Sequence, residues 1–362
     1  MLKKELYTII VATGSYIPEV VVKNEDFVNQ QFYDSKDQKL FDKSNEEIIE
    51  KFQEITDIKE RRWATNDQVT SDLATFAAKD ALESSGISPE SLDFIIVGNN
   101  FGDMDPVTKQ TVLVPNVSSR VKQRLNIVKP SITAFDVTAG CPSWVQAMIV
   151  ANAFIKAGIY KRGLVIGADI TSRPSDPFDR DSMIFSDGAG AVIVEGIESE
   201  TPVGILSHAE RTDAVDWADI IGMHPSINPE FNQPTRYLHM QGHKVYVYAL
   251  QNVPAIAKEA IDKAGLELAD IRKILIHQAN AKMDEAICQR VMKLYKMKGS
   301  TDDIMPMTIS WLGNSSSATV PTMYDLIKKD KMENHTIKSG DNIIFTSVGA
   351  GMIINAIVYR EP

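Results

Sequence analysis

The chain contains two stretches with the same pattern of hydrophobic and polar positions. Residues 78–100 and residues 257–280 each begin with a segment whose apolar residues recur at helical spacing. A glycine ends each segment at the same distance from its start, Gly86 in the first stretch and Gly265 in the second. A short polar turn and an apolar run, FIIV or ILI, then follow. We therefore expect a helix, a turn and a buried strand in both places.

Helices and strands continue to alternate in both parts of the chain. The strand-like runs SITAFDV, GLVIGAD and GAGAVIVEG belong to the first part, and NIIFTSVGAGMIINAIVYR closes the second. This alternation predicts a layered α/β fold. The repeat predicts an N-terminal half over residues 1–198 and a C-terminal half over residues 199–362, with an active site between them. Chance similarity of two common helix-strand units is the alternative.

Residues 29–59 are expected to form an extra, helical insert. Within NEEIIEKFQEITDI, the apolar Ile48, Ile49, Phe52 and Ile55 fall on one helical face, with charged residues opposite. This pattern is typical of a helix that covers the surface of a larger fold.

Composition and charge narrow the class of protein. The formal net charge of −10 disfavours a nucleic-acid partner. No segment reaches the roughly 20 apolar residues of a membrane span, and the start of the chain lacks a convincing cleavage site. Two cysteines, Cys141 and Cys288, make no disulfide framework, so we expect a cytoplasmic protein. The six histidines show no metal-ligand spacing, and we expect no bound metal.

Cys141 is the first candidate for chemistry. It lies between a strand-like run that ends at Val137 and an apolar, helix-like segment from about Pro142 to Gly158. A thiol at the N-terminus of a buried helix meets the positive end of the helix dipole, which favours the thiolate and lowers the pKa. Cysteine is also among the most buried residue types, so simple packing is the alternative.

Three further segments offer polar groups. His277 follows the strand-like run KILI and can serve as a base or have a structural role. Asn314, in the turn GNSSS, can present its amide as a donor or simply cap a helix. The turn SVGAGM, residues 347–352, can direct backbone N–H groups at an oxyanion. A phosphate loop is the competing interpretation, but neither GxGxxG nor a Walker pattern is present.

Together, the four motifs resemble those of a known enzyme family. The segments DVTAGC, IHQAN, GNSSSATVP and VGAGM stand in the order and approximate spacing of the Cys-His-Asn condensing enzymes. The chain resembles the β-ketoacyl-acyl carrier protein synthase III family of the thiolase superfamily over nearly its whole length. The resemblance implies a duplicated thiolase-like five-layer α-β-α-β-α sandwich and a homodimer.

The resemblance also implies roles for individual residues. Cys141 would accept an acyl group from a coenzyme A thioester, and His277 and Asn314 would stabilise the enolate formed when a malonyl thioester loses CO₂. The N–H groups of Cys141 and Ala350 would form the oxyanion hole. The implied activity is that of an acyltransferase of fatty acid biosynthesis. Its substrates would be acyl-CoA and malonyl-acyl carrier protein, with no tightly bound cofactor.

Four other residues and one loop are expected to contact substrate or carrier. Arg173 matches an arginine on the nucleotide side, and Lys282 replaces an arginine on the helix that faces the carrier protein. Val348 stands where phenylalanine is usual, and Trp144 follows the nucleophile where small residues are common. The loop of residues 98–116 is longer than usual, and in the family this region lines the acyl pocket across the dimer. The identity of the acyl donor depends on these positions.

Two other functions remain open. A relative could keep the acyl-cysteine but work in a resorcinol, quinolone or polyketide pathway, or act only as an acyltransferase. A non-catalytic partner subunit is disfavoured, because such chains typically lack the nucleophile and this chain keeps Cys141, His277 and Asn314. A degradative thiolase is disfavoured too, because it uses a second cysteine near the C-terminal turn, whereas Cys288 is expected in the core.

Overall fold

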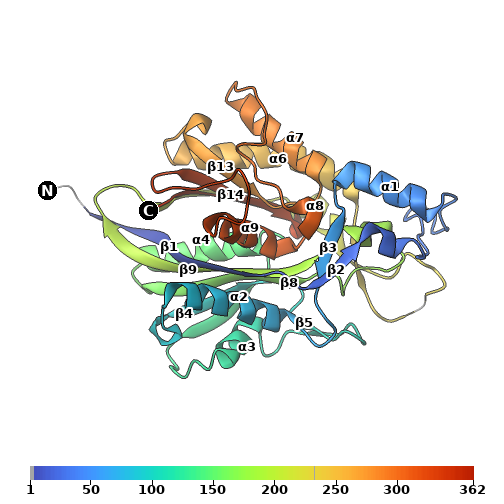
Figure 1. Ribbon diagram of the computed structural model, residues 1–362, viewed down its shortest axis with the longest axis horizontal. Helices are drawn as coiled ribbons and strands as arrows, with labels where there is room; N and C mark the ends of the chain where they lie inside the picture. The colour runs from blue at the N-terminus through green and yellow to red at the C-terminus, as the bar shows by residue number, and fades with distance from the viewer. Residues whose placement is uncertain (1–3, 232) are drawn as a thin grey trace.

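The protein is built from two β-sheets, each lying between layers of helices (Figure 1). The computed structural model describes residues 4–231 and 233–362. The outer face of the larger sheet is covered by α2 (Thr70–Ser85) and α3 (Val117–Arg124). Between the sheets lie α4 (Ser143–Lys156) and α9 (Thr319–Lys328). The outer face of the smaller sheet is covered by α6 (Gly242–Lys263) and α7 (Ala281–Leu294). The expected five-layer sandwich is confirmed.

The two sheets share one pattern of strand directions. The larger sheet has the order β1-β9-β8-β4-β7, with bounds Glu5–Tyr16, Asp187–Ser199, Arg162–Ile170, Phe94–Gly98 and Thr133–Val137. The smaller has the order β10-β15-β14-β13, with bounds Gly204–Thr212, Ile353–Arg360, Asn342–Gly349 and Ile271–Ile276. In each sheet parallel strands lie on one side and antiparallel strands on the other. The division that we expect after residue 198 falls at the end of β9, and the assignment of the two halves stays a prediction.

The repeated sequence pattern forms equivalent units in the two halves. Helix α2 leads into β4, and helix α6 leads into β13. Gly86 and Gly265 follow these helices with φ angles of 67° and 69°. Glycine adopts this left-handed conformation without the cost that a Cβ brings, so it ends each helix sharply. The helix, turn and strand expected in both stretches are confirmed.

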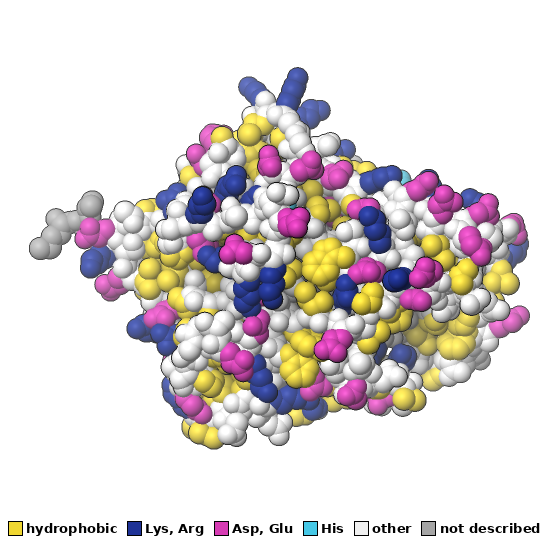
Figure 2. Space-filling view, viewed as in Figure 1, with side chains coloured by type: hydrophobic (Ala, Val, Ile, Leu, Met, Phe, Trp, Pro, Cys, Tyr) yellow, Lys and Arg dark blue, Asp and Glu magenta, His cyan; other side chains and the backbone are white. Residues whose placement is uncertain are grey.

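Shorter elements surround the two sheets. The strands are β2 (Val20–Lys23), β3 (Glu60–Trp63), β5 (Asp103–Met104), β6 (Thr111–Val112), β11 (Ile221–His224) and β12 (Tyr237–Met240). The short helices are α5 (Ala214–Trp217) and α8 (Ile309–Leu312). Strands β5 and β6 pair as a hairpin within the long loop of residues 98–116. Figure 2 shows basic and acidic side chains intermixed over one face of the molecule. In the part of the chain that the structure describes, no helix combines the length and the apolarity needed to cross a membrane.

The insert is helical only in its second part. Helix α1 (Asn45–Thr56) begins at a capping box, in which Ser44 and Glu47 exchange hydrogen bonds, and residues 29–44 are mainly loop. Ile48 and Phe52 are buried as expected, but Ile55 is 42% exposed. The prediction of a helix across the whole insert is therefore wrong, because only the segment after the Ser44 cap has an apolar face to bury.

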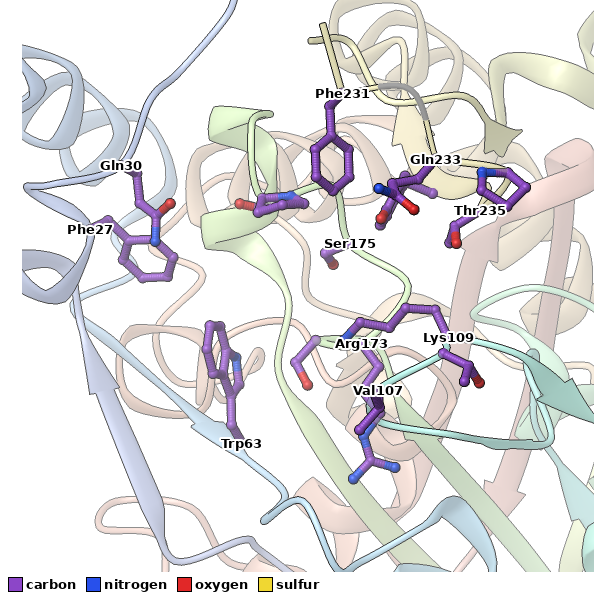
Figure 3. A pocket seen from close by; sticks show the side chains of 16 residues that line it. Phe27, Gln30, Trp63, Val107, Lys109, Arg173, Ser175, Phe231, Gln233 and Thr235 are labelled. Atoms are coloured by element: carbon purple, nitrogen blue, oxygen red, sulfur yellow. The ribbon is translucent and has the colours of Figure 1, made fainter.

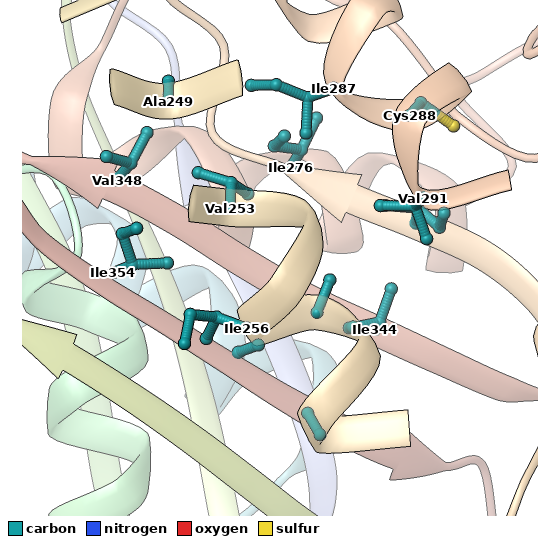
Figure 4. Close-up of a cluster of buried hydrophobic side chains, with 14 of the residues drawn as sticks. Ala249, Val253, Ile256, Ile276, Ile287, Cys288, Val291, Ile344, Val348 and Ile354 are labelled. Atoms are coloured by element: carbon teal, nitrogen blue, oxygen red, sulfur yellow. The ribbon is translucent and has the colours of Figure 1, made fainter. Parts of the chain in front are cut away.

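Hydrophobic side chains fill the spaces between the layers. Figure 4 shows the cluster between the smaller sheet and helices α6 and α7, with Val253, Ile276 and Ile354 among its members. Cys288 lies in the same cluster and is buried, which confirms that it belongs to the core. A second cluster fills the middle layer around α4 and α9.

Trp144 belongs to the middle layer of the core. Its side chain has 0% exposure and packs edge-on against Phe345 of β14, with ring centroids 5.5 Å apart. Two glycines of the larger sheet allow this close packing. A Cβ at Gly98 would lie 2.7 Å from the backbone nitrogen of Trp144, and a Cβ at Gly167 would lie 2.9 Å from the Cβ of Trp144. The helical turn after Cys141 rotates the Trp144 side chain into the core, and its contact with substrate stays a prediction.

Replacing Trp144 with alanine should lower the free energy of unfolding by about 3–5 kcal/mol, because it leaves a large cavity between the two sheets. Trp144→Phe should cost less, since a phenyl ring keeps the contact with Phe345 and removes an indole N–H that has no hydrogen-bond partner. Urea denaturation of both variants measures the difference. Equal losses, or no loss in either variant, would contradict the core assignment.

Candidate active site

Cys141 lies in the tight turn between β7 and α4. The side chain of Ser143 closes this turn: its Oγ accepts a hydrogen bond from the Ala139 N–H (2.8 Å) and donates one to the Gly140 carbonyl (2.6 Å). Cys141 as a residue keeps partial exposure to solvent, although its thiol is surrounded by protein atoms. The turn therefore holds the thiol at a point that a substrate can reach.

Two glycines allow the Cys141 turn to touch the turn that follows β14. A Cβ on Gly349 would lie 2.4 Å from the Cys141 nitrogen, and a Cβ on Gly140 would lie 2.5 Å from the Ala350 nitrogen. Gly140 also has a φ of 66°, which favours glycine. The backbone N–H groups of Cys141 and Ala350 are thus in the same part of the site. This is the arrangement that an oxyanion hole needs, and their role stays a prediction.

Burial, and not the helix dipole, dominates the acidity of the thiol. Desolvation raises the pKa of Cys141 to about 12, while a hydrogen bond from Ser316 acts in the opposite direction and the charge of Asp169 adds to the rise. The expectation of a lowered pKa is therefore wrong. Protein atoms around the sulfur remove the water that would solvate a thiolate, and the hydrogen bonds that favour the thiolate do not offset this cost.

His277 lies at the end of β13 and is uncharged at neutral pH. Its backbone N–H donates to the Thr346 carbonyl of β14 (2.9 Å), which fixes its position relative to the sheet. The ring is buried, and its Nδ1 has no hydrogen-bond partner among residues 4–231 and 233–362. Burial lowers the pKa of His277 to about 4, although an interaction with the Ser316 backbone opposes the shift. The imidazole is therefore a neutral hydrogen-bonding group.

Asn314 follows α8 and is held by backbone and side-chain contacts. Its N–H donates to the Ile184 carbonyl (3.0 Å), and its carbonyl accepts from the Ser186 N–H (2.8 Å). Its side-chain oxygen accepts from the Ser316 N–H (2.8 Å). Because the amide oxygen is the acceptor in this bond, the NH₂ group of Asn314 remains as a donor. This is the property that its predicted role requires.

Gln278 joins the strand end that carries His277 to the segment that leads to Asn314. Its side-chain oxygen accepts hydrogen bonds from the Thr308 N–H (2.8 Å) and the Ile309 N–H (3.0 Å). Gln278 is fully buried and therefore holds these two backbone segments together. It has a structural role beside the candidate site.

Ser316 contacts all three predicted catalytic residues. Its N–H binds Asn314, its backbone interacts with the His277 ring, and its hydroxyl donates to the Cys141 sulfur over 3.6 Å. Sequence reasoning did not identify this residue. The run of serines after Asn314 was the available signal, and nothing in it indicates which hydroxyl faces the thiol. Ser316 shows that the structure brings Cys141, His277 and Asn314 together.

The guanidinium of Arg173 binds backbone carbonyl groups of neighbouring loops. It is buried and donates to the backbone carbonyls of Met104 (3.0 Å), Thr65 (2.8 Å) and Gln68. The residue lines a pocket of about 500 Å³, whose wall Figure 3 shows with Phe231 and other side chains. None of the predicted catalytic residues lines this pocket. Arg173 ties loops together with three of its five N–H donors, and its contact with a nucleotide stays a prediction.

Lys282 and Val348 have different surroundings. Lys282 is exposed in the first turn of α7. It lies close enough to α1 to help lower the pKa of Glu54, although Lys51 has the larger effect. Val348 is buried in the cluster of Figure 4, next to the Gly349 turn. The contacts of Lys282 with a carrier protein and of Val348 with an acyl group stay predictions. Within the described residues, no cluster of His, Cys, Asp and Glu side chains has a geometry suited to a metal ion.

Comparison with known proteins identifies the family of this chain. Residues 135–214 match the family 3-oxoacyl-[acyl-carrier-protein (ACP)] synthase III, and residues 261–361 match the C-terminal part of the same family. A β-ketoacyl-[acyl-carrier-protein] synthase III from Staphylococcus haemolyticus is 32% identical over 348 residues, which are 96% of each chain.

Solved structures agree with this family. The 3-oxoacyl-[acyl-carrier-protein] synthase III from Aquifex aeolicus is similar with a TM-score of 0.77 and 29% identity, over 98% of this chain and 99% of that one. The priming β-ketosynthase of the R1128 polyketide pathway has the same fold, with a TM-score of 0.79 and 23% identity, over 100% of this chain and 98% of that one. The chain therefore belongs to the 3-oxoacyl-[acyl-carrier-protein] synthase III family of thiolase-like condensing enzymes.

Proposed function

We propose that this protein starts acyl chains by joining an acyl group, carried on Cys141, to a malonyl unit delivered by acyl carrier protein. The observation that supports this most is the convergence on Ser316 of Cys141, His277 and Asn314, which arrive from different elements. A thiol, a neutral imidazole and a primary amide are the groups that acyl transfer followed by decarboxylation requires. The product would be a 3-oxoacyl carrier protein of fatty acid biosynthesis.

The first half-reaction transfers the acyl group to Cys141. The sulfur attacks the carbonyl carbon of acyl-CoA, the bond to the coenzyme A sulfur breaks, and the proton lost by Cys141 ends on the departing coenzyme A thiol. The carbonyl oxygen becomes negative in the transition state. The N–H groups of Cys141 and Ala350 would bind it, and the close contacts of Gly140 and Gly349 between the two turns support this role.

The second half-reaction needs hydrogen-bond donors more than a strong base. Malonyl-acyl carrier protein loses CO₂, and the electron pair of the broken bond forms an enolate whose thioester oxygen is negative. The neutral ring of His277 and the NH₂ group of Asn314 would stabilise that oxygen. The carbanion then attacks the acyl-Cys141 carbonyl, and the Cys141 sulfur leaves.

Substrates, and no tightly bound cofactor, supply the remaining chemistry. Lys282 would meet the acidic carrier protein, since it is an exposed cation at the start of α7. Cys141 and Cys288 are free thiols, which fits a reducing compartment such as the cytoplasm. A role in a polyketide or related pathway is the second candidate. The long loop of residues 98–116, which contains the β5–β6 hairpin, favours it because this region is expected to line the acyl pocket.

Mixing the protein with a series of acyl-CoA donors should give one acyl adduct per chain, detected by intact-protein mass spectrometry. The adduct should be lost in Cys141→Ala and kept in Cys288→Ala, because Cys288 is buried in the core. The chain length that reacts fastest identifies the donor. Adding malonyl-carrier protein should then release CO₂ and a 3-oxoacyl product. An adduct that persists in Cys141→Ala would disprove the assignment.

Replacing His277 or Asn314 with alanine should slow the decarboxylation of malonyl-carrier protein about 10²-fold, because each substitution removes one donor to the enolate oxygen. Acylation of Cys141 should be affected much less. Asn252→Ala serves as the control, because it removes an amide that donates to the Tyr248 carbonyl within α6. CO₂ release measures decarboxylation, and the mass adduct measures acylation of Cys141. Equal loss of both steps would argue against separate roles.

The decarboxylation step should also tolerate mild acid. The pKa of His277 is lowered to about 4, so its ring stays neutral as the pH falls from 7.5 to 5.5 and protonates only near pH 4. With an ordinary pKa of about 6.5, most of the ring would be charged at pH 5.5. A titration of histidine ring signals by NMR, with His277→Ala for assignment, measures this directly. A midpoint near 6.5 would contradict the burial argument.

We also propose a homodimer. Strand β7 is an edge of the larger sheet, and its residues are less buried than those of β4 and β8. An unpaired edge strand is a site for pairing with a second chain. The nearby loop exposes Val114 at 87% and Leu113 at 61%, which a partner would cover.

The substitution Val114→Glu should therefore shift the protein from dimer to monomer at micromolar concentration, because it places a charge in an apolar interface. Val215→Glu, at a site that is 98% exposed on α5, is the matched control and should remain dimeric. Light scattering coupled to size-exclusion chromatography measures the mass. A monomeric wild-type protein would refute the proposal.

A further inference from the structure

A chain of buried hydrogen bonds ends at the Cys141 sulfur. The hydroxyl of Ser316 donates to this sulfur over 3.6 Å. The side-chain NH₂ of Asn100 donates both to the Ser316 hydroxyl oxygen (3.1 Å) and to Oδ2 of Asp169 (2.8 Å). Asp169 lies on β8 and Asn100 lies just after β4, so two central strands of the larger sheet supply this chain. None of these three residues has a part in the reaction described above.

The direction of each hydrogen bond follows from Asp169. Burial raises the pKa of Asp169, and hydrogen bonds from Ser317, Asn100 and Ser316 act in the opposite direction. The carboxylate form only accepts hydrogen bonds, so the Asn100 group that faces it is the NH₂ group and not the amide oxygen. Asp169 also lies at acceptor distance from the Asn100 N–H (2.8 Å) and the Ser317 hydroxyl (2.6 Å), which supports its role as an acceptor. The second N–H of the Asn100 amide then points at the Ser316 oxygen. The hydroxyl proton of Ser316 can then point at the sulfur, with the Asp169 carboxylate as a second acceptor near it.

The backbone of Ser316 is the second independent observation. This residue has a φ of 53°, in the left-handed region where side chains other than glycine are uncommon. Glycine would adopt this conformation at a lower conformational energy. A serine here is therefore strained, and the strain indicates that its side chain has a function. The conformation places the Ser316 N–H on Asn314 and its hydroxyl on Cys141 at the same time.

We propose that Ser316 is a further catalytic residue, whose hydroxyl donates to the Cys141 thiolate, and that Asn100 and Asp169 are positioning residues that hold the hydroxyl in this orientation. Hydrogen bonds to ionised groups are stronger than those between neutral groups, so the contact favours the thiolate over the thiol. The inference rests on the proposed role of Cys141 as nucleophile. It adds the group that stabilises the thiolate form of Cys141.

The surroundings of the sulfur explain why such a donor is needed. The buried thiol has a raised pKa, because desolvation opposes its charge and the negative Asp169 adds to the effect. His277, the other titratable group at Ser316, is neutral and offers no compensating positive charge. The Ser316 hydroxyl lowers the pKa of the thiol and also that of Asp169, so it interacts with both groups. It therefore supports the thiolate without bringing a second charge into the site.

The test uses alkylation of Cys141 by iodoacetamide, which needs no acyl donor. The sulfur forms a bond to the reagent's methylene carbon, iodide leaves, and the thiol proton passes to water. The rate is measured from pH 6 to 10 in the full-length protein and its variants, with peptide mapping to separate Cys141 from Cys288. Ser316→Gly removes the hydroxyl and relieves the backbone strain, Ser316→Ala removes only the hydroxyl, and thermal unfolding confirms that both are folded. Ser315→Ala is the matched control, because the Ser315 hydroxyl pairs with Thr319.

Both Ser316 variants should react about tenfold more slowly near neutral pH, with the alkylation profile of Cys141 shifted about one unit to higher pH. Ser315→Ala should match the wild type. Asn100→Ala should shift the profile in the same direction but less, since Ser316 keeps its hydroxyl and loses only its orientation. Wild-type profiles in both Ser316 variants would overturn the proposal, and a wild-type profile in Asn100→Ala would overturn the positioning role.

A second measurement separates this inference from the proposed function. Decarboxylation of malonyl-carrier protein does not need the Cys141 thiolate, so the Ser316 variants should retain it while their acylation by acyl-CoA slows about tenfold. If the wild type forms no acyl adduct but the alkylation shift is found, the proposed function fails and the role of Ser316 stands. A loss of decarboxylation equal to the loss of acylation would mean that the substitutions disturb the whole site, and would overturn the specific role.

Discussion

The contact between two glycine-containing turns is the constraint on which the site depends. Gly349 lies against the backbone of Cys141, and Gly140 lies against that of Ala350, at distances where a side chain would collide with backbone atoms. One turn precedes α4 and the other follows β14. The contact therefore also joins the half of the protein that contains the larger sheet to the half that contains the smaller sheet. Behind it, α4 is packed tightly on the larger sheet and leaves the turn little freedom to move. The backbone N–H groups of the site are therefore positioned before any substrate binds.

Burial gives this site its second property, which is the absence of charge on its reacting groups. The pKa of Cys141 is raised to about 12 and that of His277 is lowered to about 4, in both cases mainly by desolvation. Neutral donors in a dry site become effective when negative charge develops during the reaction, because no water competes with them. The same exclusion of water raises the free energy of forming the Cys141 thiolate. Negative charge in the site is then stabilised by three groups together: the Ser316 hydroxyl, the helix N-terminus and the two turns.

The candidate site and the layered fold were predictable for local reasons. Helical periodicity ending at Gly86 and Gly265 marks the repeated unit, and His277 directly follows an apolar run that had to be a strand. The surroundings of Trp144 and Arg173 were not predictable from the sequence, because they depend on burial and on distant partners. The Trp144 ring enters the core between the sheets, and the Arg173 guanidinium binds carbonyls of segments far apart in the chain. The acidity of Cys141 was wrong in direction, since a helix start is visible in a sequence and the surrounding protein is not.

The amino-acid sequence by itself determined the alternation of helices and strands, the duplication, and the residue types at the strand ends, because these depend on periodicity and on turn residues within short segments. Only the tertiary structure decided which of the serines after Asn314 faces the thiol, and that Asn100 and Asp169 lie behind it. These residues come from positions 100, 169 and 316, and their hydrogen bonds form only when β4, β8 and the turn before α9 are packed together. Contacts of this kind depend on three-dimensional packing, and a local pattern does not encode them.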